Sequence, residues 1–178
     1  MAIETIIFSS IVGFVIVQRI VELFVARNNE RWIRGQGGYE VGARHYPYMV
    51  GIHVGFFLSL IVEFLMFERE LPSLWPVLFI IFVGLQIMRV WVIASLGRFW
   101  NTKILVLPGA HVVKKGPFRF LRHPNYVVVS LEILVIPLMF GAYFTALIFA
   151  LLNLIILCVR IPMEEAALRE VTNYKEVF

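Results

Sequence analysis

Long apolar blocks, each of about 20 residues or more, constrain this chain more than any other feature of its sequence. They run over 3–26, 48–67 and 74–96, with a longer one over 127–159. Because an α-helix rises about 1.5 Å per residue, about 20 apolar residues cross the roughly 30 Å hydrocarbon core of a bilayer. Of the 178 residues, 60% are hydrophobic and only 16% are charged, unlike a soluble domain. The sequence therefore predicts an integral membrane protein with several transmembrane helices.

The longest apolar block, 127–159, contains its own break. Pro137 and Gly141 interrupt it near the middle, which predicts two short helices in a tight hairpin. The hairpin can span the bilayer or re-enter it, and the tail after it is expected to form a helix in water or at the interface. The predicted fold is an all-α, polytopic integral membrane bundle of about five transmembrane helices, with a folded-back cytoplasmic tail. We expect one structural domain, made of a three-helix membrane part (1–96) and a loop, hairpin and tail (97–178).

Basic residues are distributed unevenly among the segments that connect these blocks. Residues 27–44 contain four arginines, 97–125 contain six lysines or arginines, and the tail contains three, whereas the turn after the second block has only Arg69. By the positive-inside rule, the three basic segments are expected in the cytoplasm and the N-terminus outside. The net charge of +4 then reflects a surface that faces lipid headgroups, and membrane lipids rather than nucleic acid are the expected partners.

Residue counts argue against several classes of protein. The single cysteine, Cys158, excludes an intramolecular disulfide and a cysteine-rich metal site, and its apolar surroundings predict a buried packing residue. The chain contains no aspartate, which argues against enzymes that clamp Mg²⁺-diphosphate with Asp-rich helices. The first block lacks an early basic region and a cleavage site, so it is expected to be a span rather than a signal peptide. No metal site is predicted.

Charged side chains inside the predicted spans each need a partner or a function. They are Arg19, Glu22, Glu63, Arg89 and Glu132. Arg19 and Glu22 are three residues apart on one helix, which favours an intrahelical ion pair. Arg89 can pair with Glu63 or Glu132 across the bundle, or it can touch a ligand. His53, on the second span, is expected to be a satisfied helix–helix hydrogen-bonding residue and stays outside the predicted site.

The polar segment before the hairpin carries the densest group of chemically active residues. It contains Trp100-Asn101-Thr102-Lys103, His111 and the run from Gly116 to Tyr126. Pro124 sets the start of the next helix and holds His123 in an extended conformation, so His123 and Tyr126 are expected to point in fixed directions. A histidine beside a helix N-terminus suits recognition of an anionic group. Equally, Arg119, Arg122 and His123 can be an ordinary basic anchor at the membrane surface.

A second cluster follows the hairpin directly, in the run Arg160-Ile161-Pro162-Met163-Glu164-Glu165. Arg160 and Glu164 are four residues apart, so they face the same way if the helix continues through Pro162. A surface ion pair of little energetic value is the simpler interpretation. The hairpin, however, carries Arg160 back beside Tyr126, which joins the two clusters into one site.

Together these clusters resemble the isoprenylcysteine carboxyl methyltransferase family. The matching features are the Gly116-Pro117-Phe118 turn, the Arg122-His123-Pro124-Asn125-Tyr126 run and the segment 160–165. The resemblance covers about 97–178, and it departs from the family at Val128, where members often have a glycine. The first half, with Tyr46-Pro47, is similar to a bacterial branch of membrane methyltransferases linked to O-methylation of long-chain alkylpyrones.

The resemblance implies S-adenosylmethionine bound without a Rossmann domain, between the last two helices, the loop before them and the tail. It implies that Arg160 and Glu164 are catalytic, with Arg160 orienting the acceptor oxygens and Glu164 positioning Arg160 or facing the sulfonium. The implied cofactor-binding residues are His111, Gly116, Pro117, Arg122, His123, Pro124, Tyr126 and Glu165. The expected acceptor is a lipophilic molecule, such as an isoprenylcysteine or an alkylpyrone, that enters from the bilayer and presents a carboxylate or an acidic hydroxyl.

Two other functions remain compatible with the sequence. One is an NADPH-dependent membrane reductase of the sterol type, because such proteins resemble this family in the C-terminal hairpin. Binding of S-adenosylhomocysteine compared with NADPH separates it from a methyltransferase. The other is a non-catalytic membrane scaffold, which predicts no specific loss of ligand binding when His123 or Arg160 is replaced.

Overall fold

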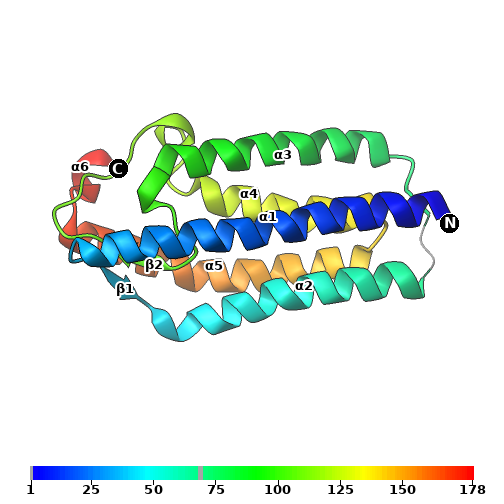
Figure 1. Cartoon of the computed structure of the whole chain (residues 1–178), viewed down its shortest axis with the longest axis horizontal. Helices are drawn as coiled ribbons and strands as arrows, with labels where there is room; N and C mark the ends of the chain where they lie inside the picture. The colour runs from blue at the N-terminus through cyan, green and yellow to red at the C-terminus, as the bar shows by residue number, and fades with distance from the viewer. Residues whose placement is uncertain (1, 68–69) are drawn as a thin grey trace.

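The computed structural model describes residues 2–67 and 70–178 and is helical apart from one small sheet. Its long helices run side by side along one axis (Figure 1): α1 (Ala2–Gly35), α2 (Tyr46–Met66), α3 (Trp75–Leu96), α4 (Pro124–Met139) and α5 (Tyr143–Val171). Within the described residues, four of them are long and apolar enough to cross a membrane, and α4 is a shorter apolar helix. The predicted all-α polytopic membrane bundle is confirmed.

The first helix is longer than its apolar block. The predicted span ended at residue 26, but α1 continues to Gly35, so half of the predicted loop 27–44 belongs to this helix. The added residues are mostly polar but include good helix formers such as arginine and glutamate, which hydropathy alone does not detect. The second and third helices agree with their predicted bounds within two residues.

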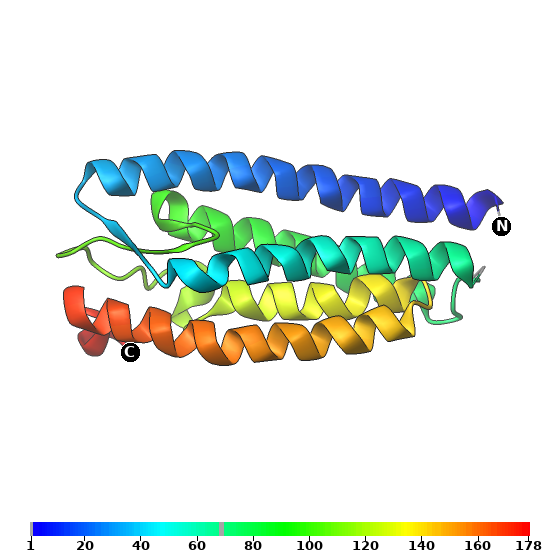
Figure 2. The same ribbon diagram turned by 90° about the horizontal axis from the view of Figure 1, so that it is seen from below.

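The C-terminal hairpin is asymmetric. Helix α4 begins at Pro124, as predicted, and the chain turns at 140–142, where Gly141 adopts a left-handed φ of 66°. Helix α5 is not short: it runs for 29 residues through Pro162, so the tail begins as part of the same helix. Figure 2 shows α4 and α5 packed side by side, with their turn at the end of the bundle where α2 and α3 are connected. The hairpin therefore extends along the bundle to that end.

A glutamate from a neighbouring helix caps the start of α5. Glu63 of α2 accepts hydrogen bonds from the backbone N–H of Phe144 (3.1 Å) and from both the backbone N–H and the hydroxyl of Thr145 (2.7 Å each). These are N–H groups that a helix N-terminus leaves without an intrahelical partner. Glu63 is therefore committed to α5, and it is not the partner of Arg89.

The other end of the bundle, here called the polar end, consists of residues 36–45, 97–123 and 172–178. It contains the short elements η1 (Ala43–His45), η2 (Gly97–Phe99), η3 (Gly116–Arg119) and α6 (Tyr174–Val177), and an antiparallel sheet of β1 (Tyr39–Val41) with β2 (Ile104–Val106). The sheet was not predicted. Figure 1 shows the C-terminus at this end and the N-terminus at the opposite end, so the three basic segments do share one side.

An ion network lies inside the bundle and joins α1, α3 and α4. Arg89 contacts Glu22 at 2.5 Å and Glu132 at 2.9 Å, and Arg19 contacts the same two carboxylates at 2.7 Å and 2.9 Å. We call these four residues the buried ion network. The predicted Arg19–Glu22 pair exists, but it is one of the four contacts in this network. Of the two glutamates considered for Arg89, Glu132 is its partner and Glu63 is not. Two positive and two negative charges balance one another.

Cys158 differs from its prediction as well. Its side chain is exposed on the outer face of α5 rather than buried. In a membrane-spanning helix an apolar environment is also found on the lipid-facing surface, so an apolar run does not by itself indicate packing inside the bundle.

Candidate functional site

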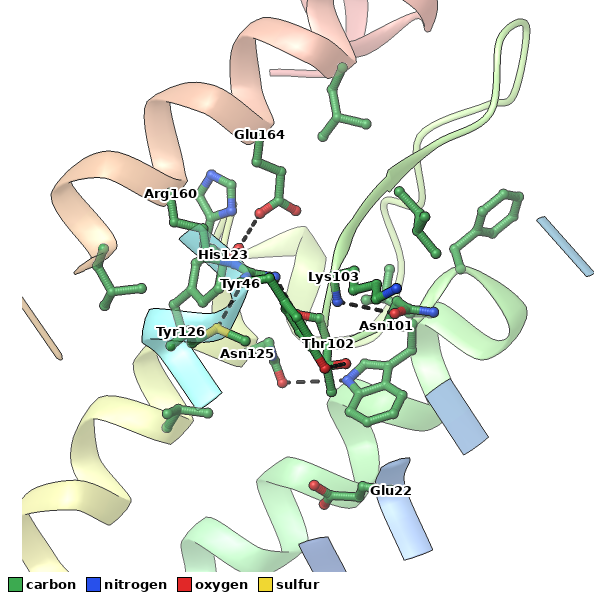
Figure 3. A pocket seen from close by; sticks show the side chains of 18 of the residues that line it. Glu22, Tyr46, Asn101, Thr102, Lys103, His123, Asn125, Tyr126, Arg160 and Glu164 are labelled. Atoms are coloured by element: carbon green, nitrogen blue, oxygen red, sulfur yellow. Dashed lines mark hydrogen bonds between the residues drawn. The ribbon is translucent and has the colours of Figure 1, made fainter. Parts of the chain in front are cut away.

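A cavity of about 440 Å³ opens inside the polar end and continues between the helices. Its walls come from all five long helices, the polar segment after α3 and the C-terminal residues. Figure 3 shows Glu164 and Arg160 of α5 near Tyr126 of α4, with Glu22 of α1 at the far end of the view. A cavity of this volume is in the range that holds one small molecule or cofactor.

Tyr126 is the centre of a three-residue cluster in this cavity. Its hydroxyl accepts a hydrogen bond from Arg160 Nε at 2.8 Å and donates one to a carboxylate oxygen of Glu164. Arg160 and Glu164 lie one turn apart on α5, which continues through Pro162, so both face the cavity as predicted. The simpler interpretation, an exposed surface pair, is wrong, because Arg160 is only 4% exposed. We call Tyr126, Arg160 and Glu164 the tyrosine-bridged cluster.

The guanidinium of Arg160 has only neutral direct partners. Besides Tyr126, it contacts the backbone oxygen of Thr102 at 2.5 Å and the sulfur of Met49 at 2.9 Å. Within the described chain it forms no ion pair. Burying a charge is costly unless an opposite charge compensates it. The cluster is therefore suited to hold an anionic group beside Arg160.

His123 is fixed from two directions at the start of α4. Its Nε2 lies 3.1 Å from a carboxylate oxygen of Glu165, and its ring stacks near Tyr126 with centroids 5.5 Å apart. Its backbone is non-helical, with φ −128° and ψ 58°, but it is not in the extended conformation that was predicted for the residue before Pro124. Glu165 also accepts a hydrogen bond from Arg169 at 2.7 Å. His123 is thus held toward the cavity by groups behind it.

The C-terminal tail folds back over the cavity. Backbone N–H groups of Gly109 and Val112 donate to Val171 O and Asn173 Oδ1 at 2.9 Å and 2.8 Å. The bonds bring Tyr174 against the cavity, where its hydroxyl is buried without a hydrogen-bond partner among the described residues. Burial raises the pKa of Tyr174 to about 12, and the nearby carboxylate of Glu165 adds to the shift. A buried donor of this kind can serve a ligand.

The cavity also reaches the side of the bundle between α1 and α2. Four apolar residues that line it are 40–54% exposed: Ile20 and Leu23 of α1, and Val50 and Val54 of α2. In a membrane these side chains face lipid. The cavity therefore has a polar mouth at one end and an apolar side opening.

Comparison with known proteins identifies the chain's relatives. The family model named isoprenylcysteine carboxyl methyltransferase (ICMT) family matches residues 77–170, more than half of the chain. This chain belongs to that family. It is 47% identical over 163 residues to the uncharacterized protein YpbQ of Bacillus subtilis (strain 168), covering 92% of this chain and 97% of that protein. It is 28% identical over 151 residues to an uncharacterized protein of Haemophilus influenzae, covering 84% and 88%. No solved structure matches it.

Membership in the ICMT family supports assigning this chain to the membrane methyltransferases. The membrane helices agree with that class, and the matched range 77–170 includes the tyrosine-bridged cluster, His123 and Glu165. The resemblance inferred from the sequence is therefore confirmed at the level of the family. The alkylpyrone branch stays a prediction.

The structure separates the predicted site residues of this ICMT-family chain into two groups. Those that line the cavity are His111, Arg122, His123, Tyr126, Arg160 and Glu164. Those that do not line it are Gly116, Pro117, Pro124 and Glu165. Gly116 has a φ of 55°, and a Cβ there would collide with the Ser95 side chain, so it allows the loop to pack against α3. Pro117 and Pro124 are buried at the starts of η3 and α4. This second group shapes the site from behind.

Val128, the departure from the ICMT-family pattern, does not narrow the cavity. It is buried between α3 and the polar segment, packed with Val92 and Phe118, and it does not line the cavity. A larger side chain than glycine is accommodated there by an apolar cluster.

Several cavity residues were missed by the sequence interpretation. Helix α2 contributes Tyr46, Met49, His53 and Phe57, which lie three or four residues apart on one helical face. That spacing was the available signal. His53 was expected to hydrogen-bond another helix, but within the part of the chain that the structure describes it does not. Its Nδ1 lies 2.8 Å from the backbone oxygen of Met49 in its own helix. Thr102, in a run already noted for its polarity, meets Tyr46 at 3.2 Å.

Lys103 supports the polar end rather than the cavity chemistry. Its ammonium donates to Glu30 at 3.0 Å and to Glu40 at 3.2 Å, which ties the end of α1 to β1. Burial lowers the pKa of Lys103, but the hydrogen bonds to Glu30 and Glu40 outweigh it and leave the pKa above its ordinary value. The side chain is therefore a cationic anchor.

Proposed function

We propose that this protein is an S-adenosylmethionine-dependent O-methyltransferase that acts on a lipophilic acceptor. The observation that carries the proposal is the environment of Arg160, a buried arginine whose direct partners are all neutral. Such a side chain can hold the acidic oxygen of an acceptor, or an anionic group of the cofactor, at low electrostatic cost.

The residues of the cavity fit the polar parts of the cofactor. Bound S-adenosylmethionine supplies an electrophilic methyl group on a positively charged sulfonium. Glu164 adds a negative charge to the cavity wall, one of its oxygens being fixed by the Tyr126 hydroxyl. His111, His123 and Arg122 line the same cavity and offer donors for a carboxylate or ribose. The buried hydroxyl of Tyr174 is available as a further donor.

The proposed role of the protein in the displacement is alignment and exclusion of water. Arg160 orients the attacking oxygen, and Tyr126 fixes the positions of both Arg160 and Glu164. An oxygen that is already anionic needs orientation and desolvation more than a strong base. The apolar walls contributed by α1 and α2 exclude water from that part of the cavity. No residue here is required to bind a metal.

The two substrates are proposed to arrive by different routes. The apolar side opening between α1 and α2 suits an acceptor with a hydrocarbon tail that diffuses in the bilayer. The polar mouth suits a water-soluble cofactor. Because the basic segments share the polar end, we propose that this end is cytoplasmic in a bacterial cell membrane and that the N-terminus is outside.

The experiment that tests the function is methyl transfer by the purified full-length protein in lipid nanodiscs. Labelled S-adenosylmethionine is supplied with prenylcysteines, fatty acids and alkylpyrones in parallel, and the labelled product is extracted. We expect transfer to at least one class, and binding of S-adenosylhomocysteine in preference to NADPH. Preferential binding of NADPH, or binding of neither ligand, would contradict the proposal.

A further inference from the structure

His53 occupies the junction between the main cavity and a second, smaller cavity of about 40 Å³ deeper in the bundle. Both cavities are lined by His53 together with Arg19 and Arg89. His53 lies one helical turn, about 6 Å, beyond Met49. The Met49 sulfur contacts the guanidinium of Arg160. The imidazole is thus positioned next to the tyrosine-bridged cluster, on the side facing the membrane interior.

The tautomer of His53 follows from its hydrogen bond. Nδ1 lies 2.8 Å from the backbone oxygen of Met49, and a carbonyl oxygen can only accept, so Nδ1 carries the proton. In the neutral ring, Nε2 is then left with its lone pair. Among the described residues no donor is bonded to Nε2. The ring therefore offers an unused proton acceptor at the cavity junction.

The charges around His53 do not engage that nitrogen. Arg19 and Arg89 face the same junction, but each is paired with both Glu22 and Glu132 in the buried ion network. These four groups sum to zero charge, so among the described residues no unpaired carboxylate or cation faces the imidazole from α1, α3 or α4. From α5, Arg160 is a nearby cation without an ion-pair partner in the described chain, and its like charge keeps the resting imidazole neutral. A neutral histidine in such surroundings is suited to take a proton from a bound molecule.

We propose that His53 Nε2 is the general base for an acceptor that reaches the cavity as an un-ionised hydroxyl, such as a long-chain enol or phenol. This inference rests on the proposed methyltransferase function. The acceptor O–H bond breaks and its proton passes to Nε2, while the oxygen forms a bond to the methyl carbon of the sulfonium donor. The carbon–sulfur bond breaks with its electron pair left on sulfur. The imidazolium then releases its proton to water through the polar mouth.

The proposal separates two kinds of acceptor. A carboxylate arrives without a proton, so His53 has nothing to remove from it. A neutral hydroxyl must lose its proton during the reaction, and a positioned base contributes roughly 10²- to 10⁴-fold to such a step. Replacement of His53 should therefore affect hydroxyl acceptors selectively.

The test uses His53→Asn, because an asparagine amide can keep the hydrogen bond to the Met49 oxygen but has no acceptor in the place of Nε2. His45→Asn is the matched control, since His45 lies in η1 and does not line the cavity. Both variants and the wild type are assayed in nanodiscs with an alkyl-substituted enol and with a fatty carboxylate of the same chain length. Binding of S-adenosylhomocysteine is measured in parallel, to show that each variant is folded.

We expect His53→Asn to lose at least 100-fold in kcat/KM for the enol and less than threefold for any carboxylate transfer, with unchanged S-adenosylhomocysteine affinity. A second variant, His53→Ala, should recover enol methylation when imidazole is added. Equal losses for both acceptors, no loss for the enol, or wild-type transfer to carboxylates alone would overturn the role of His53. Absence of transfer by the wild type to the enol, to the carboxylate and to the prenylcysteines of the earlier panel would instead overturn the proposed function itself.

Discussion

Two buried arginines in this bundle have opposite electrostatic surroundings. Arg89 is 5% exposed and contacts two carboxylates of the buried ion network, whereas Arg160 is 4% exposed and contacts a hydroxyl, a carbonyl and a thioether. The first arrangement is electrically complete within the chain. The second has a positive charge that no directly bonded group neutralises. Equal burial therefore supports two different roles, one in holding helices together and one in binding.

The largest expected effect comes from removing Arg89 from the buried ion network. Replacing Arg89 with Met leaves Glu22 and Glu132 with only Arg19 between them, and breaking a buried ion pair in this way costs about 3–5 kcal/mol. The free energy of unfolding, measured by denaturant titration in detergent, should fall accordingly. Adding Glu132→Gln restores charge balance and should recover part of the loss. If the double variant were less stable than Arg89→Met, the network would not be governed by charge balance.

Replacing Arg160 with Met should reduce methyl transfer strongly and stability only slightly. No carboxylate loses a direct ion-pair partner, so the free energy of unfolding should change by less than about 1 kcal/mol. Methyl transfer should fall about 100-fold, which is about 2.7 kcal/mol of transition-state stabilisation. Thermal unfolding and kcat/KM are measured on the same preparation. Near-normal turnover, or a stability loss as large as that of Arg89→Met, would remove the distinction between the two arginines.

Tyr126→Phe tests the bridge inside the site. The phenyl ring keeps the packing near His123, but Arg160 and Glu164 lose the hydroxyl that joins them. We expect about a tenfold loss in kcat/KM, or about 1.4 kcal/mol. Tyr48→Phe is the control, because Tyr48 is exposed on α2 and does not line the cavity. A loss no greater than that of the control would show that the bridge is not needed.

The smallest effect is a pH dependence at Tyr174. Because its pKa is raised from 10.0 to about 12 in the folded chain, the unfolded chain releases this proton first as pH rises. The stability that the neutral phenol contributes is complete below pH 10 and is lost between about pH 10 and 12. The free energy of unfolding, measured from pH 9 to 11.5, should fall more steeply with pH for the wild type than for Tyr174→Phe. The same pH dependence for both proteins would contradict the raised pKa of Tyr174.

The sequence predicted those features that depend on local spacing. Apolar block lengths gave the spans, Pro124 gave the start of α4, and the four-residue spacing of Arg160 and Glu164 placed both on one face of a continuous helix. These outcomes depend on helix geometry alone. That geometry does not depend on how the neighbouring helices pack.

Features that depend on how distant segments meet were not predictable in this way. The partner of Arg89 is decided by which glutamate faces it across the bundle, and the spacing along the chain leaves Glu63 and Glu132 equivalent. Pairing of 39–41 with 104–106 joins strands more than 60 residues apart, each too short to give a pattern of its own. The partner of His53 was predicted wrongly, because the sequence does not show whether a histidine bonds a group on another helix or a backbone carbonyl of its own helix.

The side opening between α1 and α2 has a consequence for kinetics. An acceptor that enters through it meets the protein in two dimensions, so its effective concentration is its mole fraction in the lipid. The KM for that substrate would then carry units of mole fraction, while the KM of the water-soluble donor would remain molar. Adding inert lipid at constant total acceptor would slow the reaction by surface dilution. A tenfold excess of lipid would be equivalent to a tenfold fall in substrate.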